Sequence, residues 1–267
     1  MRAALVAEYR KLVTTRMWWV LLIALAAYLA FIGGVMGFSL TVAPQPEDGT
    51  AMLEGAELAA AVYSLVNAVG YVFPLVIGSL AMTMEFRHQT ITQSLLVEPR
   101  RSVFLGAKLL VTVPLGLLYG LVATVAVVGV AGPLLEVAGD GAFLTDGRVL
   151  QVILLGVVVS ALWAVIGVAF GSVLTNQVAA IVVILAFTQF VEPIARLGLG
   201  AFDATEGVAR FLPGAAADGL MGASFFAAFG GGESDLLPRW AALLVLLAYA
   251  GGLALVGRLT TLRRDIG

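Results

Sequence analysis

Long apolar runs separated by short polar segments dominate the chain. Reading for such runs between charged residues predicts six membrane-spanning helices, because a hydrocarbon core about 30 Å thick needs roughly 20 apolar residues per helix. The runs are Met17 to Val42, Leu58 to Met84, Ser102 to Gly132, Val149 to Leu174, Gln177 to Val191 and Arg239 to Thr260. The fifth run, of about 15 residues, is short for a crossing. The pattern predicts an all-α polytopic membrane protein.

Residues 1 to 16, before the first run, form a segment of their own. Their pattern predicts an amphipathic helix that lies flat on the inner membrane surface, followed by one six-span domain over residues 17 to 267. The apolar face carries Leu5, Val6, Tyr9, Leu12 and Val13, and the polar face carries Glu8, Arg10, Lys11, Thr14 and Thr15, with Arg16 next to the span. The segment is either a charged topology signal alone or an interface helix that also touches a cytoplasmic partner.

The connector between the second and third runs covers residues 85 to 101, and its sequence predicts a second short helix. Ile91 and Leu95 are four residues apart and Leu96 lies beside them, so a helix here shows a small apolar knob flanked by Thr and Ser. Pro99 disfavours helix at Glu98 and so ends it. Such a helix either transmits force from a cytoplasmic partner to two long spans or rests on the lipid surface.

The connection from Glu192 to Pro238 is long yet contains apolar stretches at Val208 to Leu212 and Leu220 to Phe229. We expect a shortened fifth span followed by re-entrant helices that dip back into the outer leaflet. Non-helical turns are expected at Gly198, Gly200 and Pro213-Gly214, buried in protein or lining a cavity.

Composition and charge support a membrane protein with both ends in the cytoplasm. The chain is 61% hydrophobic and 12% charged, with a mean hydropathy of +1.03, unlike a soluble domain. Eleven of the 15 Lys and Arg residues, but only four of the 17 acidic ones, fall on the side of the N-terminus. Because positive charge favours the cytoplasmic side, we expect Arg100 and Arg263 inside, with the loop Ala43 to Glu57 outside.

Several kinds of chemistry are not expected on this chain. Gly106-Ala107-Lys108 is the nearest approach to a P-loop, but Arg101 and Leu109 stand where its first Gly and its Ser or Thr belong. His88 is the single histidine and there is no cysteine, which argues against a metal centre. We therefore expect no enzyme activity, no cofactor and no nucleic-acid partner.

Polar groups within the predicted spans are mostly neutral. Ser64 and Asn67 are the most polar residues of the second span and are candidates for a substrate path, although a helix–helix hydrogen bond is the more common role. Ionisable residues deep in the predicted spans are nearly missing, which argues against a proton- or sodium-coupled carrier. Three Gly-x-x-x-Gly pairs permit close helix approach without assigning any contact. They begin at Gly33, Gly116 and Gly167.

Three patches resemble the type 2 permeases of bacterial ABC exporters. The first is Ala7 to Arg16, where that family has an acidic residue, Lys-Leu and Thr-Thr-Arg. The second is the connector, and the third is Phe211-Leu212-Pro213-Gly214 before the last span. The connector matches at Glu85, Thr90, Leu95-Leu96, Pro99, Arg100 and Lys108, with Gln89 replacing the family's usual glycine.

The resemblance implies a permease in the bacterial cell membrane that pairs with a second copy or a paralogue. It further implies that two cytoplasmic ABC ATPase subunits hold ATP and magnesium and dock on the connector, which is known in the family as the coupling helix. The implied contact residues are Glu85, Arg87, His88, Gln89, Thr90, Ile91, Ser94, Leu95, Leu96, Pro99 and Arg100.

The implied activity is export of a drug, an antibiotic peptide or a lipid. Two alternatives remain: an ATP-independent secondary carrier, and a membrane scaffold or sensor that binds a cytoplasmic protein without transport.

Overall fold

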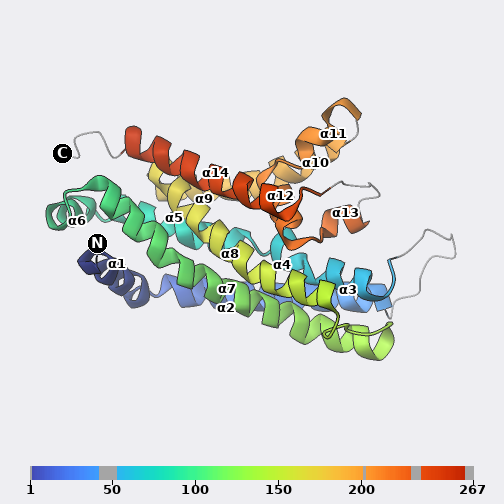
Figure 1. Cartoon of the computed structure of the whole chain (residues 1–267). Helices are drawn as coiled ribbons and strands as arrows, with labels where there is room; N and C mark the ends of the chain where they lie inside the picture. Colours follow the sequence, from blue (N-terminus) through green and yellow to red (C-terminus); the bar gives the residue numbers. More distant parts are fainter. Residues whose placement is uncertain (1, 42–52, 201–202, 230–235, 262–267) are drawn as a thin grey trace.

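The computed structural model describes residues 2–41, 53–200, 203–229 and 236–261, which are mostly helical and, over these ranges, contain no strand (Figure 1). Six helical segments are long and apolar enough to cross a membrane. The chain is therefore an all-α, multi-pass membrane protein, as the apolar pattern predicted. Most of the loop Ala43 to Glu57, and Arg263, lie outside the described residues.

The spans follow the predicted runs closely. Four spans are single helices: α2 (Met17–Thr41), α7 (Arg101–Ala138), α8 (Gly147–Val173) and α14 (Arg239–Leu259). The second span is broken into α3 (Gly55–Tyr63), α4 (Leu65–Ala68) and α5 (Val72–Arg87). The fifth span consists of α9 (Gln177–Ala186), η1 (Phe187–Val191) and α10 (Glu192–Gly200). Short helices complete the fold: α1 (Arg2–Thr14), α6 (Ile91–Val97), α11 (Asp203–Ala209), α12 (Pro213–Met221) and α13 (Phe225–Phe229).

The prediction of a shortened fifth span is wrong. Helix continues through the π-helical turn η1 into α10, so the segment Gln177–Gly200 has 24 residues and is long enough to cross. Glu192 ended the apolar run in the sequence, but its side chain is buried and it does not end the helix. Gly198 and Gly200 consequently lie in a helix, and Pro213-Gly214 begins α12.

Glycines set how closely the spans pack. Each of the three Gly-x-x-x-Gly pairs lies at a helix crossing: Gly33 of α2 against α7, Gly116 of α7 against α8, and Gly167 of α8 against α5. A Cβ atom at Gly167 would lie 2.1 Å from the carbonyl oxygen of Leu75, so only glycine lets these two backbones meet. The central helix α8 thereby holds both α5 and α7 in close contact.

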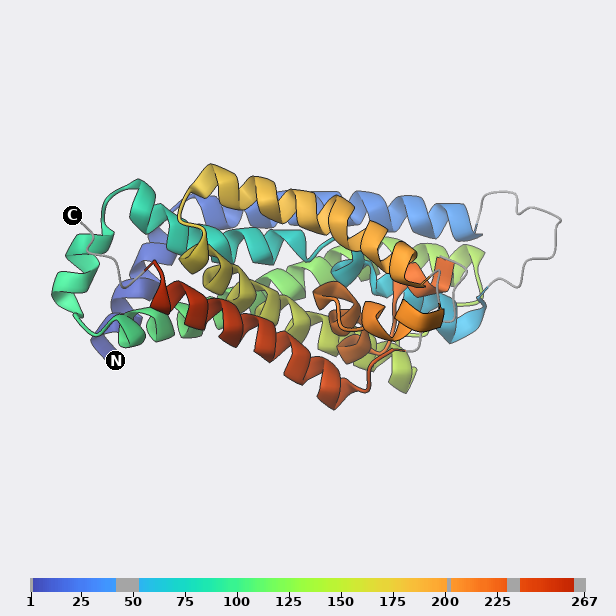
Figure 2. The same ribbon diagram turned by 90° about the horizontal axis from the view of Figure 1, so that it is seen from above.

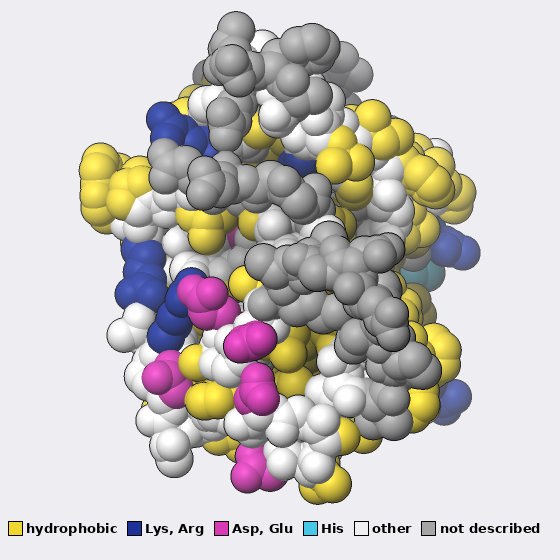
Figure 3. Space-filling view, turned by 90° about the vertical axis from the view of Figure 1, so that its right-hand side faces the viewer, with side chains coloured by type: hydrophobic (Ala, Val, Ile, Leu, Met, Phe, Trp, Pro, Cys, Tyr) yellow, Lys and Arg dark blue, Asp and Glu magenta, His cyan; other side chains and the backbone are white. Residues whose placement is uncertain are grey.

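The two ends of the bundle differ in structure and charge. Helices α1 and α6 and the last turn of α14 lie at one end, here called the α1 end, and α3 and α13 lie towards the other, the α3 end (Figures 1 and 2). Asp and Glu side chains gather at the α3 end (Figure 3). This acidic group includes the exposed residues Glu54, Glu57, Glu136 and Asp140. The charge asymmetry read from the sequence is thus also an asymmetry of the folded bundle.

The predicted re-entrant segment corresponds to α12, which packs back into the bundle against α14, α8 and α4. Eight of its nine residues are buried, including Asp218, and its left-handed C-cap is Gly222. Short buried helices at this depth keep their backbone groups satisfied within protein, as a lipid environment requires.

Candidate functional site

The polar face of α1 turns towards the bundle. Glu8 is buried, whereas the apolar side chains of Val6, Tyr9 and Val13 are exposed on the opposite side. An exposed apolar face suits contact with lipid, and the placement of α1 on the inner membrane surface stays a prediction. Glu8 and Lys11 both bind other parts of this chain, and whether α1 also touches a cytoplasmic partner stays a prediction.

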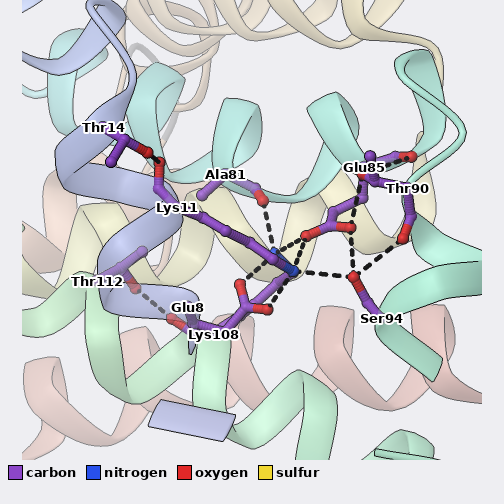
Figure 4. Close-up of polar contacts among 9 residues, drawn as sticks. All are labelled: Glu8, Lys11, Thr14, Ala81, Glu85, Thr90, Ser94, Lys108 and Thr112. Carbon is purple, nitrogen blue, oxygen red and sulfur yellow. Dashed lines mark hydrogen bonds and ion pairs between the residues drawn. The ribbon is translucent and has the colours of Figure 1, made fainter. Parts of the chain in front are cut away.

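Four charged side chains meet at the α1 end. Glu8 and Lys11 come from α1, Glu85 from the last turns of α5 and Lys108 from the second turn of α7 (Figure 4). The Lys108 ammonium pairs with Glu8 and, at 2.9 Å, with Glu85, and the Lys11 ammonium lies 2.8 Å from Glu8 and 2.7 Å from Glu85. Two acids and two bases thus form a neutral cluster, here called the charge cluster.

The hydrogen bonds of the charge cluster are complete on the lysine side. Lys108 Nζ also donates to the carbonyl oxygen of Ala81 at 3.0 Å, and Lys11 Nζ donates to Ser94 Oγ at 2.9 Å. An ammonium has three donors, so each lysine uses all of them. Burial lowers the pKa of Lys11, but hydrogen bonds and charge from Glu8 and Glu85 outweigh burial and raise that pKa above its usual value. Lys11 therefore stays charged through the physiological range.

The charge cluster also fixes α6 to the bundle. Thr90 Oγ1 and Ser94 Oγ each donate to Glu85 Oε2 at 2.9 Å, and Ser94 in addition accepts from Lys11 (Figure 4). These two residues were expected on the rim of a partner interface. They instead face the bundle and bind the carboxylate that anchors the end of α5.

The two faces of α6 have different roles. Ile91 is 2% exposed and packs with Met82 and Phe104, and the partly buried Leu95 packs against the same cluster. Leu96, by contrast, is 77% exposed. The predicted knob of three apolar residues is therefore wrong for Ile91, while Leu95 is shared between the bundle and the surface. Other predicted contact residues of the connector are exposed: Arg87, His88, Gln89, Pro99 and Arg100.

Gln89 occupies the turn between α5 and α6. Its φ of 55° is left-handed, and the Thr90 and Gln89 N–H groups donate to the carbonyl oxygens of Glu85 and Phe86. This pair of bonds is a Schellman motif, and Gln89 stands at its C′ position, where glycine is usual. The turn thus has the form that a glycine would favour, although the residue is glutamine.

Replacing Gln89 by Gly is expected to stabilise the folded protein by about 0.5–1 kcal/mol. The left-handed conformation costs an L-residue roughly 1–2 kcal/mol, and the added freedom of glycine in the unfolded chain offsets about half of that. Gln89→Val should have the opposite effect, because a β-branched side chain tolerates positive φ poorly. Thermal unfolding in detergent tests both variants, and equal melting temperatures would show that the turn is unstrained.

A second buried polar network lies in the other half of the bundle, around α12. Arg196 of α10 pairs with Glu192 at 3.0 Å and with Asp218 of α12 at 2.7 Å. Asn67 donates to Asp218, and Tyr71 Oη donates to Glu192 at 3.2 Å. The expectation that ionisable residues deep in the spans are nearly missing is therefore wrong for the fifth span, which carries Glu192 and Arg196. We call this group the α12 network.

Ser64 and Asn67 are buried inside the chain. The Ser64 hydroxyl donates to the Ala61 carbonyl oxygen, while the Asn67 amide joins Asp218 and accepts a hydrogen bond from Trp163 Nε1 at 3.0 Å. Asn67 is only 2% exposed. In this conformation Ser64 bonds within its own span, whereas Asn67 connects the second span, α8 and α12.

Comparison with protein-family models and with curated proteins finds no match for this chain. The fold therefore assigns the chain to the multi-pass α-helical membrane proteins. A more specific function has to be argued from the residues themselves.

Both networks contain residues that the sequence reasoning left unpaired. Lys108 lies inside the predicted third span, and a cation at such a position needs a buried partner. That signal predicts an acid nearby but does not select Glu8 or Glu85. Asp218 lies between small residues in an apolar stretch, which likewise indicates that a carboxylate there needs a buried partner.

Proposed function

We propose that this chain is the membrane subunit of an ATP-driven exporter whose ATPase is a separate cytoplasmic protein. The observation that carries the proposal is the charge cluster, because its four residues belong to the two patches that resemble type 2 ABC permeases. Glu8 and Lys11 come from the first patch, and Glu85 and Lys108 from the second, about 75 to 100 positions away in the sequence. Residues shared with a family and joined in space are expected to serve a shared role.

The charge cluster suits force transmission through α6. Thr90 and Ser94 bind Glu85 and thereby couple α6 to α5, while Lys11 and Lys108 couple it to α1 and α7. The outward face of α6 presents Thr92 and Leu96, which are four residues apart and both exposed. A push on that face would therefore move α1, α5 and α7 together. In this proposal the ATPase docks there, ATP drives the movement, and a hydrophobic or amphipathic substrate leaves the cytoplasm.

The site of the proposed action is the bacterial cell membrane, with both termini cytoplasmic and with a second copy or a paralogue completing the transporter. The basic α1 end is the cytoplasmic one, since Lys and Arg favour that side. We expect a membrane-impermeant maleimide to label Asp140→Cys but not Arg100→Cys on intact cells, because this chain has no other cysteine. Labelling at position 100 would reverse the orientation.

Co-purification tests the proposed function. The tagged full chain, extracted from its own cells in mild detergent, should retain an ABC ATPase that hydrolyses ATP. Leu96→Asp should release that ATPase, because an exposed anchor would become a carboxylate desolvated in an apolar cleft. Arg258→Gln is the matched control: it changes the net charge equally, is exposed and lies at the end of α14. Loss of the ATPase from both variants, or from neither, would contradict docking on α6.

A secondary carrier is the second candidate, and the α12 network favours it. Glu192, Arg196 and Asp218 are buried ionisable residues of the kind that ion-coupled carriers use. Such a carrier would transport substrate into proteoliposomes under a proton or sodium gradient with no ATPase present, and Asp218→Asn would abolish this. A scaffold would show neither gradient-driven transport nor ATP turnover.

A further inference from the structure

A groove of about 470 Å³ opens beside the charge cluster. It lies among α1, the beginning of α2, α5, the connector and α7, and its volume falls in the roughly 300–1,000 Å³ range of small-molecule sites. The proposed ATPase contact uses the outward face of α6, so the groove is a separate feature. Its occupant does not follow from the proposed function.

The lining of the groove is amphipathic along its length. Ile77, Leu80 and Ala81 of α5 line the deep part, while His88 and Gln93 line the part at the end of the bundle. Ile77 precedes the last residue of α5 by ten positions, so the groove reaches about 15 Å into the span at 1.5 Å per residue. An apolar floor below a polar mouth matches a molecule with a hydrocarbon tail and a polar head.

Charge at the mouth indicates the sign of that head. Arg16 lies between the lining residues Thr15 and Met17, its side chain is exposed, and no described group pairs with it. His88 is exposed as well and has no described partner. Among the charged lining residues, Glu8, Glu85, Lys11 and Lys108 neutralise one another, and Glu98 is paired with Arg100 at 2.8 Å. Arg16 therefore adds an unpaired positive charge beside these lining residues, and the His88 ring adds a hydrogen-bond donor.

We propose that the groove binds one acidic phospholipid, with an acyl chain along Ile77 and Leu80 and the phosphate near Arg16 and His88. Anionic lipids gather at basic segments next to a membrane span, because Lys and Arg attract their phosphate groups. The bound lipid contacts both α1 and the connector, so it stabilises the packing of α1 next to α6. Lipid binding at this site requires no ATPase, so the proposal does not depend on whether the chain is a transporter.

Native mass spectrometry of the detergent-purified full chain tests the site. With phosphatidylglycerol and phosphatidylcholine supplied in equal amounts, we expect one phosphatidylglycerol per chain to be retained at least tenfold more strongly. Glycerol phosphate, which has the head without the tail, should not be retained. Equal retention of the two lipids would overturn the proposal, and retention of glycerol phosphate would assign the site to a free phosphate ester instead.

Two groove variants separate this site from general lipid contact. Ala7→Trp and Ala4→Trp fill the groove from α1 and should each remove the retained lipid, whereas Ala248→Trp on the exposed face of α14 should keep it. Arg16→Gln should retain a lipid but lose the preference for phosphatidylglycerol. Unfolding temperatures measured on the same samples identify a variant that fails to fold. Folded Ala7→Trp and Ala4→Trp proteins that keep the lipid would overturn the proposal.

Discussion

Replacing Lys108 by Met is expected to destabilise the protein by about 3–5 kcal/mol, the usual cost of removing one partner from a buried ion pair. Lys108 is buried and is bonded to both carboxylates of the charge cluster. Its loss leaves Glu8 and Glu85 with Lys11 as the one remaining cation of the cluster. Denaturant unfolding in detergent, followed by tryptophan fluorescence, measures the change.

A double variant tests whether unpaired charge causes this loss. Lys108→Met combined with Glu8→Gln leaves Lys11 and Glu85 as a neutral pair, so it should be more stable than Lys108→Met alone. The matched control is Arg148→Met, because Arg148 and Glu57 form an exposed pair whose removal should cost about 0–1 kcal/mol. If the double variant is the less stable one, packing of the lysine stem rather than charge would account for the effect.

The second large effect is expected from Arg196→Met in the α12 network. Arg196 is bonded to two buried carboxylates, and removing it leaves Glu192 and Asp218 with neutral donors alone, at a cost of about 3–5 kcal/mol. Because Asp218 holds α12 against α10 and the second span, protease should then cleave first near α12. Limited proteolysis of the wild type and the variant measures this.

The α12 network predicts how a second variant should behave. Asn67→Leu keeps the ion pairs but removes the amide that joins Asp218 to Trp163, so its loss of stability should be smaller than that of Arg196→Met. A smaller loss is expected because a hydrogen bond to a charged group such as Asp218 contributes about 1.5–3 kcal/mol, which is less than the cost of leaving a buried charge unpaired. Equal protease resistance of Arg196→Met and the wild type would show that α12 is held by apolar packing.

The number of spans could be predicted because lipid imposes it. A stretch such as Val149 to Leu174 has no stable place outside a membrane, and Arg148 before it and the polar run 175–177 after it mark where it ends. The fifth span was misjudged because Glu192 interrupts the apolar run. Its partner Arg196 is four residues later in the same helix, and Asp218 is far along the chain. The pairing of Arg196 with Asp218, over 22 positions, leaves no local periodic signal.

The candidate site was predicted in part for the same reason. Sequence periodicity placed Ile91, Leu95 and Leu96 on one short helix, which the structure has. It could not say which side of that helix the bundle covers, because the deciding contacts come from Met82 and Phe104 on two other helices. The hydroxyls of Thr90 and Ser94 likewise read as surface groups until Glu85 is placed beside them. The local sequence pattern thus predicts the helix, whereas contacts with other helices determine which of its faces is buried.

Cross-linking from position 96 tests the central claim most directly. In this cysteine-free chain, Leu96→Cys carrying a short photoreactive maleimide should cross-link in intact cells to an ABC ATPase, while Leu244→Cys on the exposed face of α14 should not. The account predicts one cross-linked product that contains the nucleotide-binding subunit and that depends on position 96. No cross-link to an ATPase from position 96, or an equal yield from position 244, would contradict the proposal that α6 couples this membrane domain to ATP hydrolysis.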